Sequence, residues 1–397
     1  MRRIVVVGNG IAGLTACDSL RAGGFDGELT VVGAESHQPY SRPALSKALL
    51  HADAGLSLSA HELPEPTHGA AELLGQSAAG LDADRRTVIL GGGGELPYDG
   101  LVIASGSRAR RLTPQDPGEE RSCRELTLRT IEDAIELKRS VAARPSVIVI
   151  GGGPLGMEVA SGCLAAGCAV TLVADVPPLS RQLGHHLSGI FTTAALSRGL
   201  RIVTGGKAQI VSPPEGRRVL LADGTELEAE LMVTAIGDAP NVEWLAGSGL
   251  LVDGQLHADS RGRIRPDIVA AGDVTSFPAP GGPRRVPLWT SAIDSARAAA
   301  GGLLLGDSAP EWDLMPYFWT DGFGLSLKAA GFTPVSGAPD YVEPGEADGS
   351  MLLRWDRGNG GGTAAALNYR IPVPKLRRLA QAGPGSVVRS AVPAAAR

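Results

Sequence analysis

Two stretches of this chain repeat one pattern. Residues 3–35 and 146–175 each contain an apolar run of β-branched residues, a GxGxxG turn, a helix of small residues, a second apolar strand and an acid. The glycines permit a tight turn, a close approach of the main chain to a pyrophosphate, and close packing of the helix on the strand. One copy is weak evidence, because it can be only a glycine-rich strand-to-helix turn. Two copies predict two Rossmann-like folds and two bound dinucleotides, and two dinucleotides that meet indicate hydride transfer.

In each copy we expect the pyrophosphate at the N-terminus of the helix, where free N–H groups and the helix dipole favour negative charge. The acid that follows, Glu35 or Asp175, is placed to accept a hydrogen bond from a ribose hydroxyl. An acid repels a 2′-phosphate, and no arginine follows Asp175 before Arg181, so the second copy favours NADH over NADPH. The predicted cradles comprise Gly8, Gly10, Ala12, Gly13 and Glu35 in the first copy and Gly151, Gly153, Pro154, Leu155, Gly156 and Asp175 in the second.

Bulk properties exclude several classes of protein. The length of 397 residues suits two or three domains, and the net charge of −5 argues against non-specific binding of nucleic acid. The apolar run at residues 4–7 ends at Gly8, so it is too short for an export signal or a membrane span. We expect a cytoplasmic protein without membrane or nucleic-acid partners, as a monomer or a weak homodimer.

The cysteines and histidines lack the spacing of a site. The four cysteines, Cys17, Cys123, Cys163 and Cys168, form no CxxC motif, and the seven histidines are scattered. Cysteines on helices of small residues are most simply buried apolar residues. The sequence predicts no structural disulfide and no bound metal.

Four other segments bear on a cofactor or on domain organisation. Arg42 and Lys47 could meet a flavin pyrophosphate or ring carbonyl, although from composition alone a solvated loop before a helix is the simpler interpretation. Residues 101–106 predict a buried strand that ends in small residues, as a close approach of backbone to a cofactor requires. Asp273 could bind a polyol chain or cap a turn. Residues 107–124, rich in Arg, Pro, Gly and Glu, predict a linker between domains.

The ordered motifs GNGIAG, YSRPALSK, YDGLVIASG, GGGPLGMEVA, AIGDAPN, AAGDV and PYFWTDG give the chain a family resemblance. It resembles the flavoprotein NADH-dependent ferredoxin reductases of oxygenase systems, of the putidaredoxin reductase and biphenyl dioxygenase reductase type, over residues 1–383. The resemblance implies a glutathione-reductase-like α/β fold with two Rossmann-like domains and a C-terminal α/β domain. The implied units are an FAD-binding domain at 1–112 and 238–313, an NADH-binding domain at 113–237 and a C-terminal domain at 314–383. The Ala, Pro, Gly and Ser composition of the last residues predicts a mobile tail at 384–397.

The resemblance also implies roles for single residues. Glu158 would face the nicotinamide and pair with Lys47, and these two are the candidate catalytic residues; the alternative for Glu158 is an acid that serves the helix dipole. Further implied contacts of a non-covalently bound FAD are Arg42 and Lys47 beside the flavin, Asp273 on the ribityl chain, and Trp289 and Trp319 against or near the isoalloxazine. The remaining candidate cofactor contacts are Ala104, Ser105, Gly106, Gly237 and Gly272.

The chain departs from the family where the flavin edge and a partner would meet. RxESWxNAxxQA has become RVPLWTSAIDSA from Arg285, and FWSDQ has become FWTDG. Because ferredoxins of such systems are commonly acidic, Arg285 is the candidate docking residue. A solvated surface cation is an equally good interpretation of this arginine.

The activity implied by the resemblance is reduction of a 2Fe-2S or similar ferredoxin by NADH through FAD, in service of a cytochrome P450 or a Rieske-type oxygenase. Two alternatives stay open. A disulfide reductase of the same fold needs a redox cysteine at the flavin, and SRPALSK has none; an NADH oxidase belongs to the same group of alternatives. A redox-sensing flavoprotein resembling apoptosis-inducing factor is not excluded by any motif.

Overall fold

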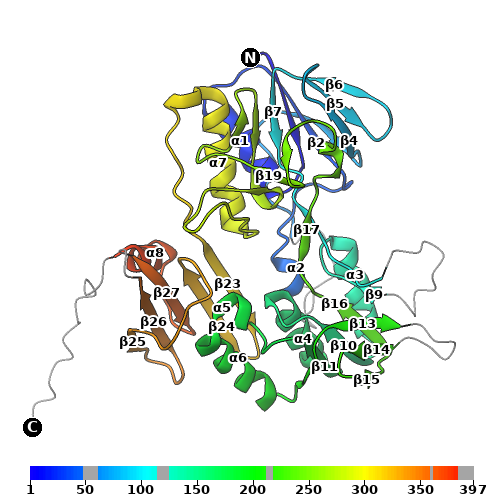
Figure 1. Ribbon diagram of the computed structural model, residues 1–397, viewed down its shortest axis with the longest axis vertical. Coiled ribbons are helices and arrows are strands. Elements are labelled where there is room, and N and C mark those ends of the chain that lie inside the picture. Colours follow the sequence, from blue (N-terminus) through cyan, green and yellow to red (C-terminus); the bar gives the residue numbers. More distant parts are fainter. Residues whose placement is uncertain (48–60, 114–124, 212–217, 358–360, 383–397) are drawn as a thin grey trace, which may run out of the picture.

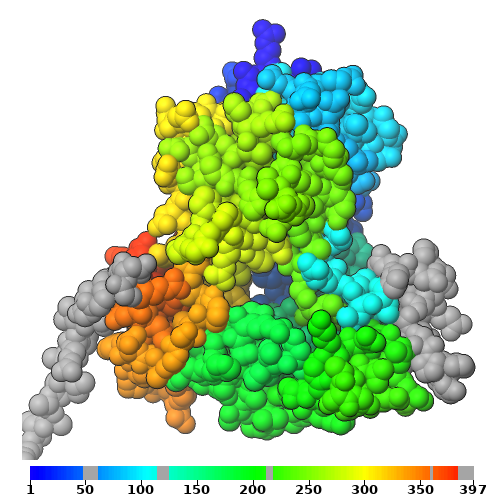
Figure 2. Space-filling model, viewed as in Figure 1, coloured from blue at the N-terminus to red at the C-terminus, as the bar shows by residue number. Residues whose placement is uncertain are grey.

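The structure, a computed structural model, describes residues 1–47, 61–113, 125–211, 218–357 and 361–382. These residues form three α/β units (Figure 1). The units surround a hollow, which faces the viewer in Figure 2. The predicted tail at 384–397 and Cys123 lie outside the described residues. The predicted α/β class is confirmed.

The first nucleotide fold is built on a six-stranded sheet of order β20-β21-β7-β1-β2-β3. Its strands are β1 (Arg3–Val7), β2 (Glu28–Gly33), β3 (Ala71–Leu74), β7 (Gly100–Ile103), β20 (Arg263–Arg265) and β21 (Ile268–Ala270). All neighbours are parallel except β20 and β21. Two segments that are far apart in the sequence therefore share one sheet.

Small residues determine the packing on one face of this sheet. Helices α1 (Ile11–Ala22) and α7 (Trp289–Leu305) lie side by side on it (Figure 1). Their shared core contains many alanines, among them Ala16 and Ala296, which allow a close approach. The opposite face is covered by the short strands β4 (Ala78–Asp82), β5 (Thr87–Leu90), β6 (Glu95–Pro97), β18 (Leu251–Val252), β19 (Gln255–His257) and β22 (Thr275–Ser276).

The second nucleotide fold has an all-parallel sheet of order β12-β11-β10-β16-β9. Burial on both faces explains the nearly continuous apolar runs of its central strands. The strands are β9 (Glu125–Leu126), β10 (Ser146–Ile150), β11 (Ala169–Ala174), β12 (Arg201–Thr204) and β16 (Leu231–Thr234), and a small antiparallel sheet adds β13 (Ala208–Val211), β14 (Arg218–Leu221) and β15 (Glu226–Leu227). The helices are α3 (Ile131–Val141), α4 (Pro154–Ala165), α5 (Ser180–Leu183) and α6 (His185–Ser197).

Two short antiparallel strands, β8 (Ser107–Ala109) and β17 (Asp238–Pro240), connect the two nucleotide folds (Figure 1). The first residues of the predicted linker are therefore part of a strand. The short helix α2 (Ala44–Lys47) extends from the first fold and contacts α4 of the second.

The C-terminal unit is an antiparallel sheet of order β23-β24-β27-β26-β25 with helix α8 (Val373–Gln381). Its strands are β23 (Tyr317–Gly322), β24 (Leu325–Ala330), β25 (Tyr341–Pro344), β26 (Met351–Asp356) and β27 (Gly362–Leu367). One face of this sheet shares a hydrophobic core with the second nucleotide fold. That core contains Leu327 and Trp355 from the sheet and Phe191 from α6. The other face packs against α8 through Leu376. The C-terminal sheet and the second nucleotide fold thus form one packed body.

In the part of the chain that the structure describes, no helix has both the length and the apolar composition needed to cross a membrane. The same residues include no group of three or more His, Cys, Asp or Glu side chains that could hold a metal ion.

Candidate functional site

The two GxGxxG turns have nearly the same geometry. Gly8 and Gly151 have φ angles of 119° and 117°, a region that L side chains rarely adopt. A Cβ atom on Gly13 would lie 1.8 Å from the Gly8 carbonyl oxygen, and one on Gly156 would lie 1.9 Å from the Gly151 carbonyl oxygen. Any side chain at these places would separate the helix from its strand. The two glycine motifs therefore form the same backbone turn.

The helix N-termini at both turns are open to a ligand. The N-cap residues Gly10 and Gly153 have extended backbones and make no side-chain capping bond. A Cβ on Gly10 would meet nothing within 4 Å, and one on Gly153 would meet only Gln182 Nε2, at 3.7 Å. The first N–H groups of α1 and α4 thus face free space, which is what a pyrophosphate at a helix N-terminus requires. Both cradles fit the phosphates of a dinucleotide.

Both cradles open into one cavity of about 1330 Å³. Three of the predicted site residues do not line it. Gly13 and Gly156 lie behind their turns, and Gly272 lies between α1 and α7, where its N–H donates to Ser295 Oγ over 3.0 Å. The predicted residues that do line the cavity are Gly8, Gly10, Ala12, Glu35, Arg42, Lys47, Ala104, Ser105, Gly106, Gly151, Gly153, Pro154, Leu155, Glu158, Asp175, Gly237, Asp273, Trp289 and Trp319.

At the acid of the first cradle, three side chains form a connected group. The Tyr40 hydroxyl donates to Glu35 Oε2 over 2.5 Å, and the Arg42 guanidinium forms an ion pair with the same carboxylate. Arg42 Nη1 also donates to the backbone oxygen of Arg129 over 2.9 Å. Burial raises the pKa of Tyr40, so its hydroxyl stays a donor. Arg42 therefore lies at the Glu35 end of the cavity, whereas Lys47 lies at the Glu158 end.

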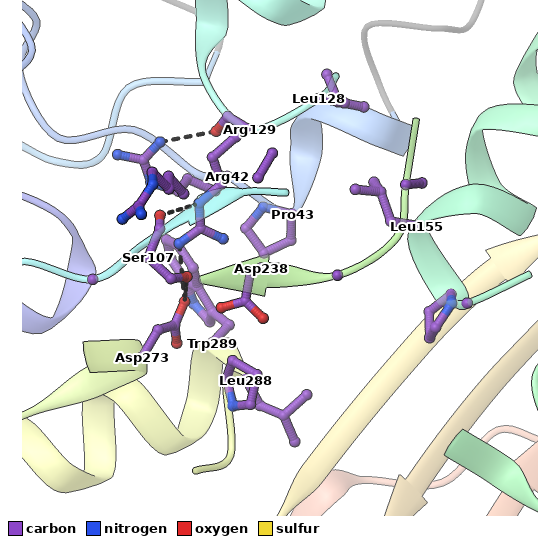
Figure 3. A pocket seen from close by; sticks show the side chains of 18 of the residues that line it. Arg42, Pro43, Ser107, Leu128, Arg129, Leu155, Asp238, Asp273, Leu288 and Trp289 are labelled. Carbon is purple, nitrogen blue, oxygen red and sulfur yellow. Dashed lines mark hydrogen bonds and ion pairs between the residues drawn. The ribbon is translucent and has the colours of Figure 1, made fainter. Parts of the chain in front are cut away.

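Asp273, the candidate ligand of a polyol chain, is held by a cation that sequence reasoning missed. Arg129 Nη2 lies 3.0 Å from Asp273 Oδ2, and both side chains line the cavity (Figure 3). Arg129 comes directly before Thr130, whose side chain forms a capping box with Asp133 at the start of α3. The sequence shows only that Arg129 lies next to the start of a helix. It does not show that Asp273 is the partner of this arginine.

Arg285 is not the solvated surface cation that the sequence allowed. Its guanidinium forms a bidentate pair with Asp238, with Nη2 2.9 Å from Oδ1, and Nη1 donates to the backbone oxygen of Asp273 over 2.9 Å. Each side chain of the pair is 23% exposed. Burial opposes ionisation of Asp238, but hydrogen bonds from Arg285 and Ser107 and the nearby positive charge hold its pKa below the usual range. Arg285 is thus an internal cation at the junction of the two nucleotide folds and is not a solvated surface cation. Its role in docking a ferredoxin stays a prediction.

At the other end of the cavity lies the pair that the family resemblance implied. Lys47 Nζ is 2.8 Å from Glu158 Oε1, and the two side chains are 22% and 7% exposed. The ammonium also lies 5.8 Å from the centre of the Trp319 ring, which stacks on Tyr317. Glu158 lies on α4, one turn beyond the open N-terminus of that helix. The predicted pairing is confirmed, and the role of the pair in a reaction stays a prediction.

The acid of the second cradle has a cation beside it. Arg181 Nη1 lies 2.9 Å from Asp175 Oδ2, and the two side chains are 62% and 39% exposed. The sequence spacing indicated that Asp175 has no arginine nearby. In the structure, the turn between β11 and α5 brings Arg181 next to Asp175. The pair is accessible to solvent, so its net electrostatic effect is small.

The described cysteines have no part in the site. Cys17, Cys163 and Cys168 are buried free thiols, and none of them lines the cavity. Burial raises the pKa of both Cys17 and Cys163 to about 12. Since a reactive thiol has to be accessible and ionised, three buried thiols outside the cavity do not support a disulfide reductase.

Comparison with known proteins agrees with this geometry. The sequence profile of the pyridine nucleotide-disulphide oxidoreductase family matches residues 2–296. The chain is 34% identical over 332 residues to the ferredoxin–NAD(+) reductase component of the p-cumate 2,3-dioxygenase system of Pseudomonas putida. The alignment covers 83% of this chain and 81% of that protein. It is 35% identical over 362 residues to rhodocoxin reductase of Rhodococcus erythropolis, in an alignment that covers 88% of this chain and 82% of that protein. The structure matches the crystal structure of the covalent putidaredoxin reductase–putidaredoxin complex with a TM-score of 0.82 and 29% identity, over 96% and 92% of the two chains.

The chain therefore belongs to the pyridine nucleotide-disulphide oxidoreductase family. Among its relatives are the ferredoxin–NAD(+) reductases of oxygenase systems, so the resemblance seen in the ordered motifs is confirmed. The glutathione-reductase-like arrangement of two nucleotide folds and a C-terminal unit is confirmed as well.

Proposed function

We propose that this protein is an FAD-dependent NADH:ferredoxin oxidoreductase whose ferredoxin serves a cytochrome P450 or a Rieske-type oxygenase. The observation that carries the proposal is the convergence of two open nucleotide cradles on one cavity, with Lys47, Glu158 and Trp319 in its wall. The names of the relatives support the choice of a ferredoxin as acceptor. One is the ferredoxin–NAD(+) reductase component of a dioxygenase system, and another is rhodocoxin reductase.

In this proposal the first cradle holds FAD and the second holds NADH. The N-terminus of α1 binds the FAD pyrophosphate, Glu35 a ribose hydroxyl, and Asp273 the ribityl chain, with Arg129 fixing the position of Asp273. The bound FAD supplies the chemistry of accepting a hydride from NADH and releasing electrons one at a time. The protein brings the two reactants together and excludes water, because orientation is its main contribution to such a reaction. Trp289 and Trp319 form part of the cavity wall.

The Lys47–Glu158 pair has a distinct task. A buried carboxylate is costly without a partner, and the ammonium provides one while the nicotinamide is absent. We propose that Lys47 turns aside when the nicotinamide enters, so that Glu158 faces the incoming ring. The side chain of Lys47 is more exposed than that of Glu158, and water can solvate the ammonium once the pair has opened.

The test uses the purified full chain. Its FAD content is measured first, and its flavin absorbance is then followed under anaerobic NADH. NADH-driven reduction of cytochrome c, with and without a 2Fe-2S ferredoxin, measures the second half of the reaction. Bleaching by NADH and a strong dependence on ferredoxin are expected. A colourless protein that does not take up FAD would contradict the proposal, whereas bleaching with slow ferredoxin reduction and NADH-dependent dimerisation would favour the redox-sensing alternative.

A further inference from the structure

Three parts of the chain meet at the carboxylate of Glu158. Lys47 Nζ donates to Oε1 over 2.8 Å, Thr320 Oγ1 donates to the same oxygen over 2.6 Å, and the Ser46 hydroxyl donates to Oε2. Ser46 and Lys47 belong to α2 of the first nucleotide fold, and Glu158 belongs to α4 of the second. Thr320 belongs to β23 of the C-terminal sheet. The C-terminal unit therefore reaches the site by a hydrogen bond to the residue that is expected to face the nicotinamide.

Two of these donors, Thr320 and Lys47, differ in how firmly they are held. Thr320 is 2% exposed and lies in a strand paired with β24 opposite Leu327. Its branched side chain restricts rotation about χ1. The Lys47 side chain is 22% exposed, flexible and free to be solvated. A motion that removes the ammonium from Glu158 therefore leaves the threonine hydroxyl in place.

We infer that Thr320 is a positioning residue for hydride transfer, whose hydroxyl holds Glu158 Oε1 in place when Lys47 turns aside. The inference rests on the proposed function and adds to it a role for the C-terminal unit. The physical reason is that a buried carboxylate that loses its cation must keep its remaining hydrogen bonds to stay in a single orientation. Strand β23 also presents Trp319 to the Lys47 ammonium, so neighbouring residues of one strand contact both partners of the pair.

A matched set of variants separates positioning from general stabilisation. Thr320→Val removes the hydroxyl at nearly constant shape, and Thr320→Ser keeps it. Thr363→Val is the control, because Thr363 is 1% exposed in the same sheet and donates to the Phe332 backbone oxygen over 2.6 Å, away from Glu158. For each variant we would measure the rate of anaerobic flavin bleaching at saturating NADH, the dissociation constant of NAD⁺ by calorimetry, and Tm.

Thr320→Val is expected to lower the limiting bleaching rate about tenfold, the lower end of the effect of one hydrogen bond to a charged group. The NAD⁺ dissociation constant should change less than the rate, because the lost interaction orients a group and does not bind the phosphates. Thr320→Ser should restore the wild-type rate. Thr363→Val should lower Tm without slowing the bleaching.

A double-mutant cycle measures whether Thr320 acts through Glu158, by the bleaching rate and, independently of the reaction, by Tm. If Thr320 acts through Glu158, Thr320→Val should change neither the rate nor Tm further in a Glu158→Ala background. Additive losses in the cycle, equal slowing by Thr320→Val and Thr363→Val, or a wild-type rate in Thr320→Val would each overturn the inference. Failure of the wild-type flavin to bleach with NADH would instead overturn the proposed function, so the two failures are distinguishable.

Discussion

The two nucleotide cradles share a backbone but differ in what surrounds it. In the first, Glu35 is 30% exposed and is bonded to both Tyr40 and Arg42. In the second, Asp175 is 39% exposed and has only the exposed Arg181 beside it among the described residues. A connected, half-buried group suits a cofactor that stays bound, and an open acid suits a substrate that exchanges. We therefore expect the shared backbone to provide the phosphate site in both cradles, and the groups around each acid to set how long its ligand stays bound.

A second difference lies inside the helices. Glu158 is two residues beyond Gly156, and the equivalent position of α1, two residues beyond Gly13, is occupied by Thr15. The buried acid thus occurs only in the cradle proposed for NADH. One added carboxylate, with its partners from two other units, distinguishes the cradle proposed for NADH from the cradle proposed for FAD.

The largest expected effects come from filling the tight turns. Gly13→Ala should yield a colourless protein, because its Cβ would lie 1.8 Å from the Gly8 carbonyl oxygen. Gly156→Ala should stay yellow but bind NAD⁺ more than about tenfold more weakly. Flavin absorbance and calorimetry measure the two properties. Gly189→Ala in α6, where a Cβ meets nothing within 4 Å, is the control. Loss of FAD in Gly156→Ala would show that the two cradles do not bind separate ligands.

The next effect concerns the junction of the two folds. Arg285→Ala should destabilise the protein by about 2 kcal/mol, somewhat less than the loss of a partner in a fully buried pair. NADH-to-ferricyanide and ferredoxin turnover should fall together, because Asp238 and Asp273 both lose a donor. Urea unfolding and the two assays at low and high salt measure this. Arg85→Ala, at a side chain 70% exposed on the outer hairpin, is the control. A loss confined to ferredoxin turnover, and smaller at high salt because salt screens the attraction to an acidic partner, would support the docking hypothesis.

Selectivity between coenzymes tests the openness of the second cradle. Asp175→Asn removes the charge that repels a 2′-phosphate and releases Arg181 to bind it, so kcat/KM for NADPH relative to NADH should rise about tenfold. In Arg181→Ala/Asp175→Asn the gain should be smaller. Arg181→Ala alone should change NADH turnover little, since an exposed pair contributes about 0–1 kcal/mol. Steady-state kinetics with both coenzymes measure this ratio. An unchanged ratio in Asp175→Asn would place the ribose elsewhere.

The smallest effect is a pH dependence. The pKa of Asp238 is lowered in the folded state, so its stabilising contribution is present above the unfolded-state pKa of about 3.9 and is lost as the pH falls through the lower folded-state value. The difference in unfolding free energy between wild type and Asp238→Asn should therefore be constant from neutral pH down to about pH 5 and shrink below pH 4. Urea titrations at pH 3, 4 and 7 would measure it, and a difference that grows on acidification would contradict the assignment.

Much of the site could be predicted from local sequence. The glycine spacing fixed both cradles, and the acids after each second strand were placed correctly at the cavity. The pairing of Lys47 with Glu158 came from the ordered motifs of a family, because 111 residues separate the two and no periodicity joins them. The pairing of Arg285 with Asp238 was not predicted, since a run such as PRRVP does not show which way a guanidinium points.

The sequence by itself determined the repeated backbone turn, because its constraints act over a few residues, where a Cβ atom either fits or clashes. Only the tertiary structure decided which charges meet. Arg129 with Asp273, Arg285 with Asp238 and Thr320 with Glu158 are pairs separated by 144, 47 and 162 residues, and each forms because a sheet edge or a shared core brings distant segments together.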